Sequence, residues 1–243
     1  MIGQPRRAAG KSRQDPAPAS GPDLPAAMEK PAFLKPSSIE VVDAVKSLYA
    51  DQLKPFGRIL LKRIRERRAA AVAAATGDRE AVIDPDALPL IDPKCLRSVC
   101  SACKSLCVQP EDGKEYSVLL VGWPSTFVDV CSARDPYPAE LWGGAASYFE
   151  SLDGNEILLP GGRYACAQEL VSRSLTFLQA RSLGEVCHIV QLAVSQKRIL
   201  GYLDGSMVPY GRSVEWVKEQ CAVRQQPVCT TKRAESAIPC ATW

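Results

Sequence analysis

Histidine and aromatic residues are scarce in this sequence. One histidine occurs among 243 residues, and Phe, Trp and Tyr together make up 7% of the chain. A single histidine makes a catalytic triad or a histidine-rich metal centre difficult to build, and no pair of acidic residues stands out as an acid/base couple. We therefore expect no enzymatic activity and no small-molecule substrate.

Long apolar runs and a strong excess of charge are also lacking. No stretch approaches the roughly 18 apolar residues of a transmembrane helix. The first residues carry arginines without the apolar core of a secretory signal. The 30 Lys and Arg against 27 Asp and Glu leave a net charge of only +3, which excludes a histone-like protein. The expectation is an intracellular protein, cytoplasmic or nuclear, that does not associate with membranes.

Cysteine, by contrast, is plentiful, with 10 residues. In a reducing compartment these are expected to be free thiols or metal ligands. Cys95, Cys100, Cys103 and Cys131 approximate the spacing of plant-type [2Fe–2S] ferredoxins, which makes them candidate ligands of an iron–sulfur cluster or a structural zinc ion. No glycine separates the first three, however, and the apolar residues around them recur at helical spacing. We favour buried helix thiols and no cofactor, with the metal site as the alternative.

The two halves of the chain repeat one order of elements, namely three helices followed by a hairpin. Each half contains a capping box, at Ser37–Glu40 and Ser182–Glu185, and an Asp-Gly turn between extended runs, at 112–113 and 204–205. The pattern L-x-x-V-C also occurs once in each half, at 96–100 and 183–187. Helices are predicted at 39–49, 53–75, 94–106, near 136–149, at 164–178 and at 186–194.

This repeated order predicts a mainly α protein with short β-hairpins, in the α+β class. We expect two winged-helix-like units, at 37–122 and 136–212. A disordered proline-rich tail is expected at 1–36 and a flexible C-terminal tail at 213–243. The alternative is that the halves are unrelated α+β pieces that happen to share hairpins.

The second predicted helix concentrates positive charge. Between positions 54 and 68 there are seven Lys and Arg residues and a single acid, Glu66. Such a helix is typical of phosphate contacts whose affinity falls steeply with salt, although a basic face can also serve only to keep the helix soluble. The run lacks the interleaved aromatic residues of a platform on which single-stranded bases stack. The candidate nucleic-acid-binding residues are Arg58, Lys62, Arg63, Arg65, Arg67, Arg68, Arg97, Lys104, Lys197 and Arg198.

The first unit, residues about 37–122, resembles the LOTUS (OST-HTH) family of winged-helix modules. The resemblance covers about a third of the chain, and the second unit is not assigned to the family on its own. It implies a non-catalytic adaptor that binds RNA or docks onto a partner protein such as an RNA helicase. The features that carry it are the helix Ile39–Tyr49, the Gly57-x-x-Leu60 helix, the Asp92-Pro93 start leading to Leu96 and Leu106, and the wing Val108–Val121.

Together these observations predict a non-catalytic nucleic-acid-binding protein, with RNA favoured over DNA. The basic helix would contact phosphates without sequence preference, and the winged-helix surface would add contacts of shape. A protein–protein adaptor is the alternative, and a zinc or iron–sulfur protein is the third possibility.

Overall fold

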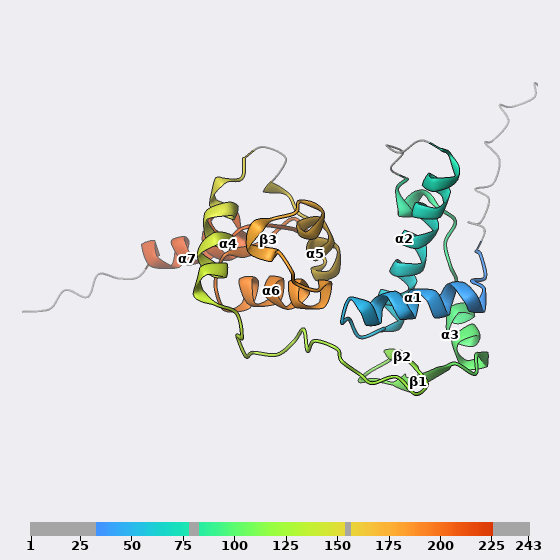
Figure 1. Cartoon of the computed structure of the whole chain (residues 1–243). Helices are drawn as coiled ribbons and strands as arrows, with labels where there is room; N and C mark the ends of the chain where they lie inside the picture. Colours follow the sequence, from blue (N-terminus) through green and yellow to red (C-terminus); the bar gives the residue numbers. More distant parts are fainter. Residues whose placement is uncertain (1–32, 78–82, 154–156, 226–243) are drawn as a thin grey trace, which may run out of the picture. The chain divides into compact units, whose positions relative to one another are not determined.

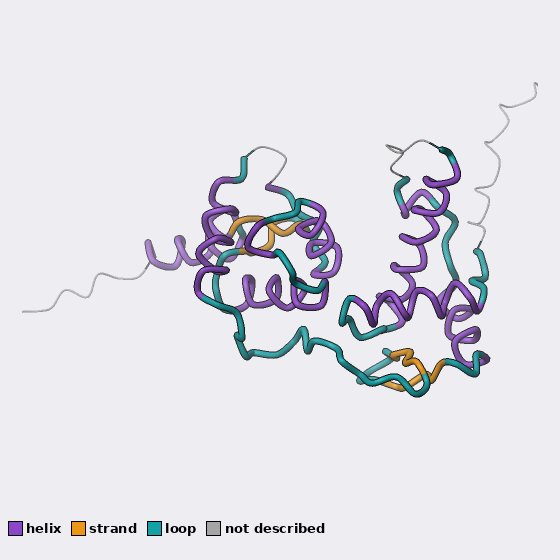
Figure 2. Tube along the Cα trace, viewed as in Figure 1, coloured by secondary structure: helices purple, strands orange, loops and turns teal. Residues whose placement is uncertain are grey.

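The computed structural model describes residues 33–77, 83–153 and 157–225 (Figures 1 and 2). The predicted order of three helices and a hairpin occurs twice in this part of the chain, and the α+β class is confirmed. The first set consists of α1 (Ser38–Ala50), α2 (Gly57–Ala75), α3 (Pro93–Ala102), β1 (Leu106–Pro110) and β2 (Tyr116–Leu120). The second consists of α4 (Ala139–Ser151), α5 (Arg163–Ser172), α6 (Leu183–Ser195), β3 (Leu200–Leu203) and β4 (Ser206–Pro209), followed by α7 (Val214–Gln225). Short 3₁₀ turns are η1 (Pro85–Ala87), η3 (Thr176–Leu178) and η4 (Tyr210–Arg212).

Local capping fixes where several of these helices begin. The Ser37 hydroxyl accepts from the Glu40 N–H, while the Glu40 carboxylate accepts from the Ser37 N–H at 2.8 Å. Ser182 and Glu185 form the same reciprocal pair at the start of α6. At α3 the Asp92 carboxylate accepts from the backbone of the second helical residue. These caps satisfy N–H groups that have no partner within the helix, so the predicted helix starts are set by short-range chemistry.

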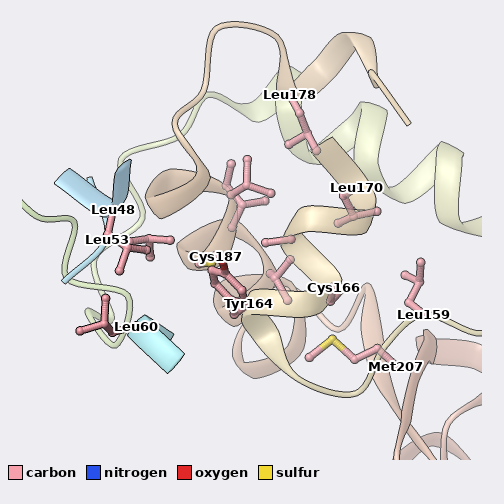
Figure 3. Close-up of a cluster of buried hydrophobic side chains, with 14 of the residues drawn as sticks. Leu48, Leu53, Leu60, Leu159, Tyr164, Cys166, Leu170, Leu178, Cys187 and Met207 are labelled. Carbon is pink, nitrogen blue, oxygen red and sulfur yellow. The ribbon is translucent and has the colours of Figure 1, made fainter. Parts of the chain in front are cut away.

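A single cluster of buried apolar side chains runs through both halves. It includes Leu48 and Leu60 from α1 and α2, and Tyr164 and Cys187 from α5 and α6 (Figure 3). Each hairpin is antiparallel, and Val118 and Leu120 of β2 and Met207 and Val208 of β4 are buried in this core. No helix within the described ranges combines the length and hydropathy needed to cross a membrane.

The end of α1 meets the start of α6 through a backbone contact. The Gly184 N–H donates to the Asp51 carbonyl at 2.8 Å. A Cβ at position 184 would lie 2.6 Å from the Gln52 carbonyl oxygen, so only glycine permits this approach. The carbonyl end of one helix thereby faces the N–H end of another, which is a favourable arrangement of helix dipoles. The contact positions the two halves against each other.

Some predicted helix bounds differ from the structure because tertiary pairing competes with helix formation. Helix α2 begins at Gly57 rather than at 53, since Phe56 forms an antiparallel bridge with Ser117 and extends the hairpin by one short segment. Helix α3 ends at Ala102, because Cys103 is extended and leads into β1. In the second half, α5 stops before Ser174, whose φ is +51°.

Parts of the two terminal segments that were expected to be tails, 1–36 and 213–243, form ordered structure. Residues 1–32 and 226–243 lie outside the described residues, but Leu34 forms a parallel bridge with Ile91. At the other end α7 occupies part of the predicted 213–243 tail. The Ser213 hydroxyl accepts from the Trp216 N–H at 3.2 Å, which is an N-cap that the sequence analysis missed.

Candidate nucleic-acid interface

The cationic side chains of α2 divide into two groups by their surroundings. One group is half-buried and paired with acidic side chains of the fold, and it consists of Arg63, Arg65 and Arg68. The other group is exposed, and it consists of Arg58, Lys62 and Arg67. The helix is therefore only partly available to a ligand, although its sequence is basic throughout.

Arg63 is the centre of a polar network that joins α1, α2 and α5. Its guanidinium donates to the Asp51 carboxylate and to the Tyr164 hydroxyl, the latter at 3.0 Å. The Tyr164 hydroxyl in turn donates to the Glu66 carboxylate at 2.7 Å. Burial raises the pKa of Tyr164, so this hydroxyl stays protonated and keeps its donor. Arg63 thus forms ion pairs with two carboxylates, those of Asp51 and Glu66, and stabilises the fold.

Arg65 and Arg68 are likewise engaged within the molecule. Arg65 forms an ion pair with Asp86 at 2.8 Å, which ties α2 to the 3₁₀ turn η1. Arg68 donates from Nε and from Nη2 to the two oxygens of Glu40, which belongs to the capping box of α1. Because Arg63, Arg65 and Arg68 are paired within the fold, they are less available to a phosphate group than the exposed Arg58, Lys62 and Arg67.

The Arg68–Glu40 pair predicts a stability loss in acid. The guanidinium of Arg68 lowers the pKa of Glu40 to about 2, below its usual 4.5. Ionised Glu40 therefore stabilises the fold above pH 4.5, and this contribution is lost as the pH falls towards 2. Because the carboxylate is partly exposed, the expected loss is about 1 kcal/mol or less. Denaturant unfolding should show Glu40→Gln less stable than wild type at pH 6 and equally stable near pH 2. A difference that stays constant over this range would contradict the pairing.

Exposed cations and aromatic rings meet where α2, α3 and β2 come together. Arg97 of α3 lies over the Tyr116 ring, with 5.1 Å between the guanidinium carbon and the ring centroid. The Tyr116 ring packs on Gly57, where a Cβ would come within 2.5 Å of it. Arg58 lies over Phe56 at 5.9 Å. We call Phe56, Arg58, Arg97 and Tyr116 the aromatic–basic surface.

The charges of this surface are weakly compensated. The Arg58 side chain is 65% exposed and lies at 3.9 Å from Glu115, a separation at which an exposed pair contributes little. Lys62 follows one turn later on the same face of α2 and is exposed, as is Lys104 beyond α3. Arg97 is also exposed. These positive side chains are open to an anionic ligand.

The two predicted cations of the second half are compensated. Lys197 pairs with Asp135 at 2.6 Å, and Arg198 pairs with Glu219 at 3.2 Å. Both lie in the turn between α6 and β3. Their charge is shared with neighbouring acids, so they are weaker candidates than Arg58 and Arg97.

Phe56 and Tyr116 are the site residues that the sequence analysis missed. Phe56 immediately precedes α2, and Tyr116 lies in β2 and reaches the same place only through the fold. One sequence signal was present, because glycine has no Cβ and so permits another group to approach the backbone closely. Gly57 occupies that position, under the Tyr116 ring. The sequence alone did not indicate that Tyr116 is the residue that packs on Gly57.

The candidate metal ligands do not form a ligand set. Cys100 is buried in α3, and burial raises its pKa to about 11, which keeps the thiol protonated. Cys95 lies at the start of α3, and Cys103 at its end. Cys131 lies elsewhere, with its sulfur 3.9 Å from Arg163. Within the described parts of the chain, no three His, Cys, Asp or Glu side chains are grouped to hold a metal ion.

The single histidine is a structural residue. His188 is buried in α6, and its Nε2 lies 3.0 Å from the Ser132 carbonyl, to which it donates. Nδ1 then accepts from the Tyr137 hydroxyl, also at 3.0 Å. Both ring nitrogens are therefore hydrogen-bonded, and the ring holds the segment that contains Ser132 and Tyr137, between the two halves, against α6.

Comparison with known proteins identifies one family in the second half. Residues 153–222, which begin just after α4 and extend into α7, match the model of the OST-HTH Associated domain. The searches of curated proteins and of solved structures gave no match. Domains of the OST-HTH type are in general non-catalytic binding modules. The match confirms the expected link to the OST-HTH/LOTUS proteins, because it is to the domain that is associated with them, but it lies at 153–222 and not at 37–122, where the resemblance was predicted.

Proposed function

We propose that this protein binds RNA, without catalysis, through the aromatic–basic surface and the exposed cations beside it. The observation that carries the proposal is the convergence of α2, α3 and β2 on exposed guanidinium groups held against aromatic rings. The family match supports a binding role. The cations beside the surface are Lys62 and Lys104.

The geometry suggests how such binding would work. A guanidinium that already rests on a ring loses less conformational freedom when it binds a phosphate than a free side chain does. Arg58 and Arg97 are both held in this way. Lys62 adds a flexible point charge one turn along α2. Phosphate contacts of this kind do not distinguish sequences, so binding is expected to depend on charge and on strand shape.

A protein-adaptor function is the second candidate, and α7 carries the observation that favours it. Trp216, Val217 and Val223 are exposed on this helix, to 39%, 50% and 64%. Exposed apolar side chains that gather on one helix are typical of a docking face. A partner such as an RNA helicase would be compatible with the family match, and RNA binding and docking use different parts of the chain.

Salt-dependent RNA affinity tests the proposed function. Fluorescence anisotropy with a labelled single-stranded RNA should show affinity falling steeply between 50 and 200 mM salt. Replacing Arg58, Lys62 and Arg97 together by glutamate should weaken binding at least about tenfold and reduce the salt slope by about 2. The reduced slope follows because three phosphate contacts are removed.

A second triple variant serves as the matched control. Lys46, Arg134 and Lys218 are exposed cations away from the aromatic–basic surface, and their replacement by glutamate changes the net charge by the same amount. This control should retain most of the affinity. Equal losses in the two variants would show that only net charge matters, and no RNA binding by the wild type would leave the adaptor function as the better candidate.

A further inference from the structure

A cavity lies beside the aromatic–basic surface and shares two of its residues. Its volume is about 390 Å³, within the range of ligand pockets in proteins. Phe56 and Arg58 line it from the first half, together with Leu53, which is labelled in Figure 3. The remaining wall comes from residues 127–131 and from α5 and α6. The cavity is therefore continuous with the proposed RNA interface.

The walls of the cavity are mainly apolar. Leu53, Ile59, Phe127 and Val130 supply aliphatic and aromatic surface, and Phe56 adds a second ring. The Phe127 ring is held in place by an edge contact with Tyr49, whose centroid is 4.7 Å away. An apolar space bounded by fixed aromatic rings suits a flat, weakly polar group such as a heterocyclic base.

Charged side chains also line the cavity. Lys54, Arg58 and Arg163 are the cationic lining residues, and Asp129 is the acidic one. Lys54 is paired with Glu111 at 2.6 Å, so Arg58 and Arg163 are the stronger candidates for an anion. The Asp129 carboxylate accepts a hydrogen bond from the Cys131 N–H at 3.0 Å, so one of its oxygens already has a partner within the same loop. Arg163 is oriented by a 2.6 Å bond to Gln191. A mainly apolar lining that also includes Arg58 and Arg163 is complementary to a nucleotide, whose base is apolar on its faces and whose phosphate is anionic.

We propose that this cavity receives one unpaired base from an RNA strand bound on the aromatic–basic surface. This inference rests on the proposed function and adds the class of RNA to it. The base would lie between the Phe56 and Phe127 walls, with its flanking phosphates near Arg58 and Arg163. A base inside a duplex cannot reach the cavity, because it is stacked and paired. The cavity would then bind an unpaired base of any identity, since its walls offer mainly apolar contacts.

The experiment compares RNA strands and one cavity-filling variant. Single-stranded RNA should bind the full chain about tenfold more tightly than a duplex of the same length, as expected from the stacking of one base. A strand in which every nucleotide is abasic should lose this advantage. Val130→Trp, which places a large ring in the cavity, should bind single strands and duplex equally while keeping the salt dependence of the wild type.

Val121→Trp is the matched control, because Val121 is 58% exposed and does not line the cavity. It should bind RNA as the wild type does. The comparison of normal, abasic and duplex RNA uses the wild-type chain, so it remains decisive if Val130→Trp unfolds. Equal binding of all three RNAs by the wild type overturns the base-binding role and leaves phosphate binding intact. Single-strand preference that survives Val130→Trp in a folded variant also overturns it and assigns the cavity to another occupant, such as a protein side chain. No binding to any RNA overturns the proposed function itself.

Discussion

Replacing Arg63 by alanine is expected to lower the free energy of unfolding by about 3 kcal/mol or more. The Arg63 side chain is only 11% exposed and pairs with the Asp51 and Glu66 carboxylates. Its loss leaves both of these acids, and the Tyr164 hydroxyl that bonds to Arg63, without a cationic partner. Removing one member of a half-buried ion-pair network is costly because the remaining charges stay desolvated. Urea denaturation followed by circular dichroism measures the change.

Lys62→Ala is the matched control for this prediction. Lys62 precedes Arg63 in α2 and carries the same charge, but it is exposed. Its replacement should change the free energy of unfolding by less than about 0.5 kcal/mol. For RNA affinity we expect the opposite: Lys62→Ala should weaken binding more than Arg63→Ala, since Lys62 belongs to the proposed interface and Arg63 does not. A stable, folded Arg63→Ala protein with a selective loss of RNA affinity would restore Arg63 to the interface.

Replacing Gly184 by alanine is expected to destabilise the protein by about 2 to 3 kcal/mol. Within a helix this substitution ordinarily stabilises, by about 0.5 to 1 kcal/mol, because alanine has less freedom to lose on folding. Here the new Cβ would meet the Gln52 carbonyl oxygen at 2.6 Å and the Asp51 carbonyl oxygen at 3.0 Å. Backbone atoms cannot rotate away, so α1 and α6 must separate and the hydrogen bond between them weakens. Thermal unfolding monitored by calorimetry shows whether Gly184→Ala raises or lowers the stability of the protein.

Gly143→Ala in α4 provides the comparison. No atom lies within 4 Å of a Cβ built at Gly143, in the described part of the chain. The same substitution should therefore stabilise the protein by the ordinary helix increment. Opposite signs at positions 143 and 184 are expected. If both substitutions stabilise, the close approach of α1 and α6 is not a feature of the protein in solution.

Short-range signals account for the part of the fold that the sequence predicted well. The capping boxes at Ser37 and Ser182 need only residues three positions apart, and the Asp-Gly turns need only two adjacent residues. Both kinds of signal predicted elements that the structure contains. The missed N-cap at Ser213 is also local, and its serine could have been read in the same way.

Long-range pairing accounts for what the sequence could not predict about the candidate site. Lys62 and Arg63 are adjacent and chemically alike, yet only one meets carboxylates in the fold. The distinction depends on Asp51 and Tyr164, which come from α1 and α5. The aromatic–basic surface depends equally on the meeting of α2 with β2, some 60 positions later in the chain. Periodicity predicts which face of a helix is polar, but it does not identify the residue that lies opposite.

The buried thiols have a consequence for the chemical behaviour of the folded chain. Burial raises the pKa of Cys166 and of Cys187 to about 12, so at neutral pH neither is present as the nucleophilic thiolate. Cys107, Cys131 and Cys221 are exposed to solvent. Alkylating reagents are therefore expected to react first with the exposed thiols, whereas Cys166, which has no exposed surface, becomes accessible only when α5 separates from its neighbours. Because alkylation is irreversible, a modified Cys166 would remain as a record that such an opening has occurred.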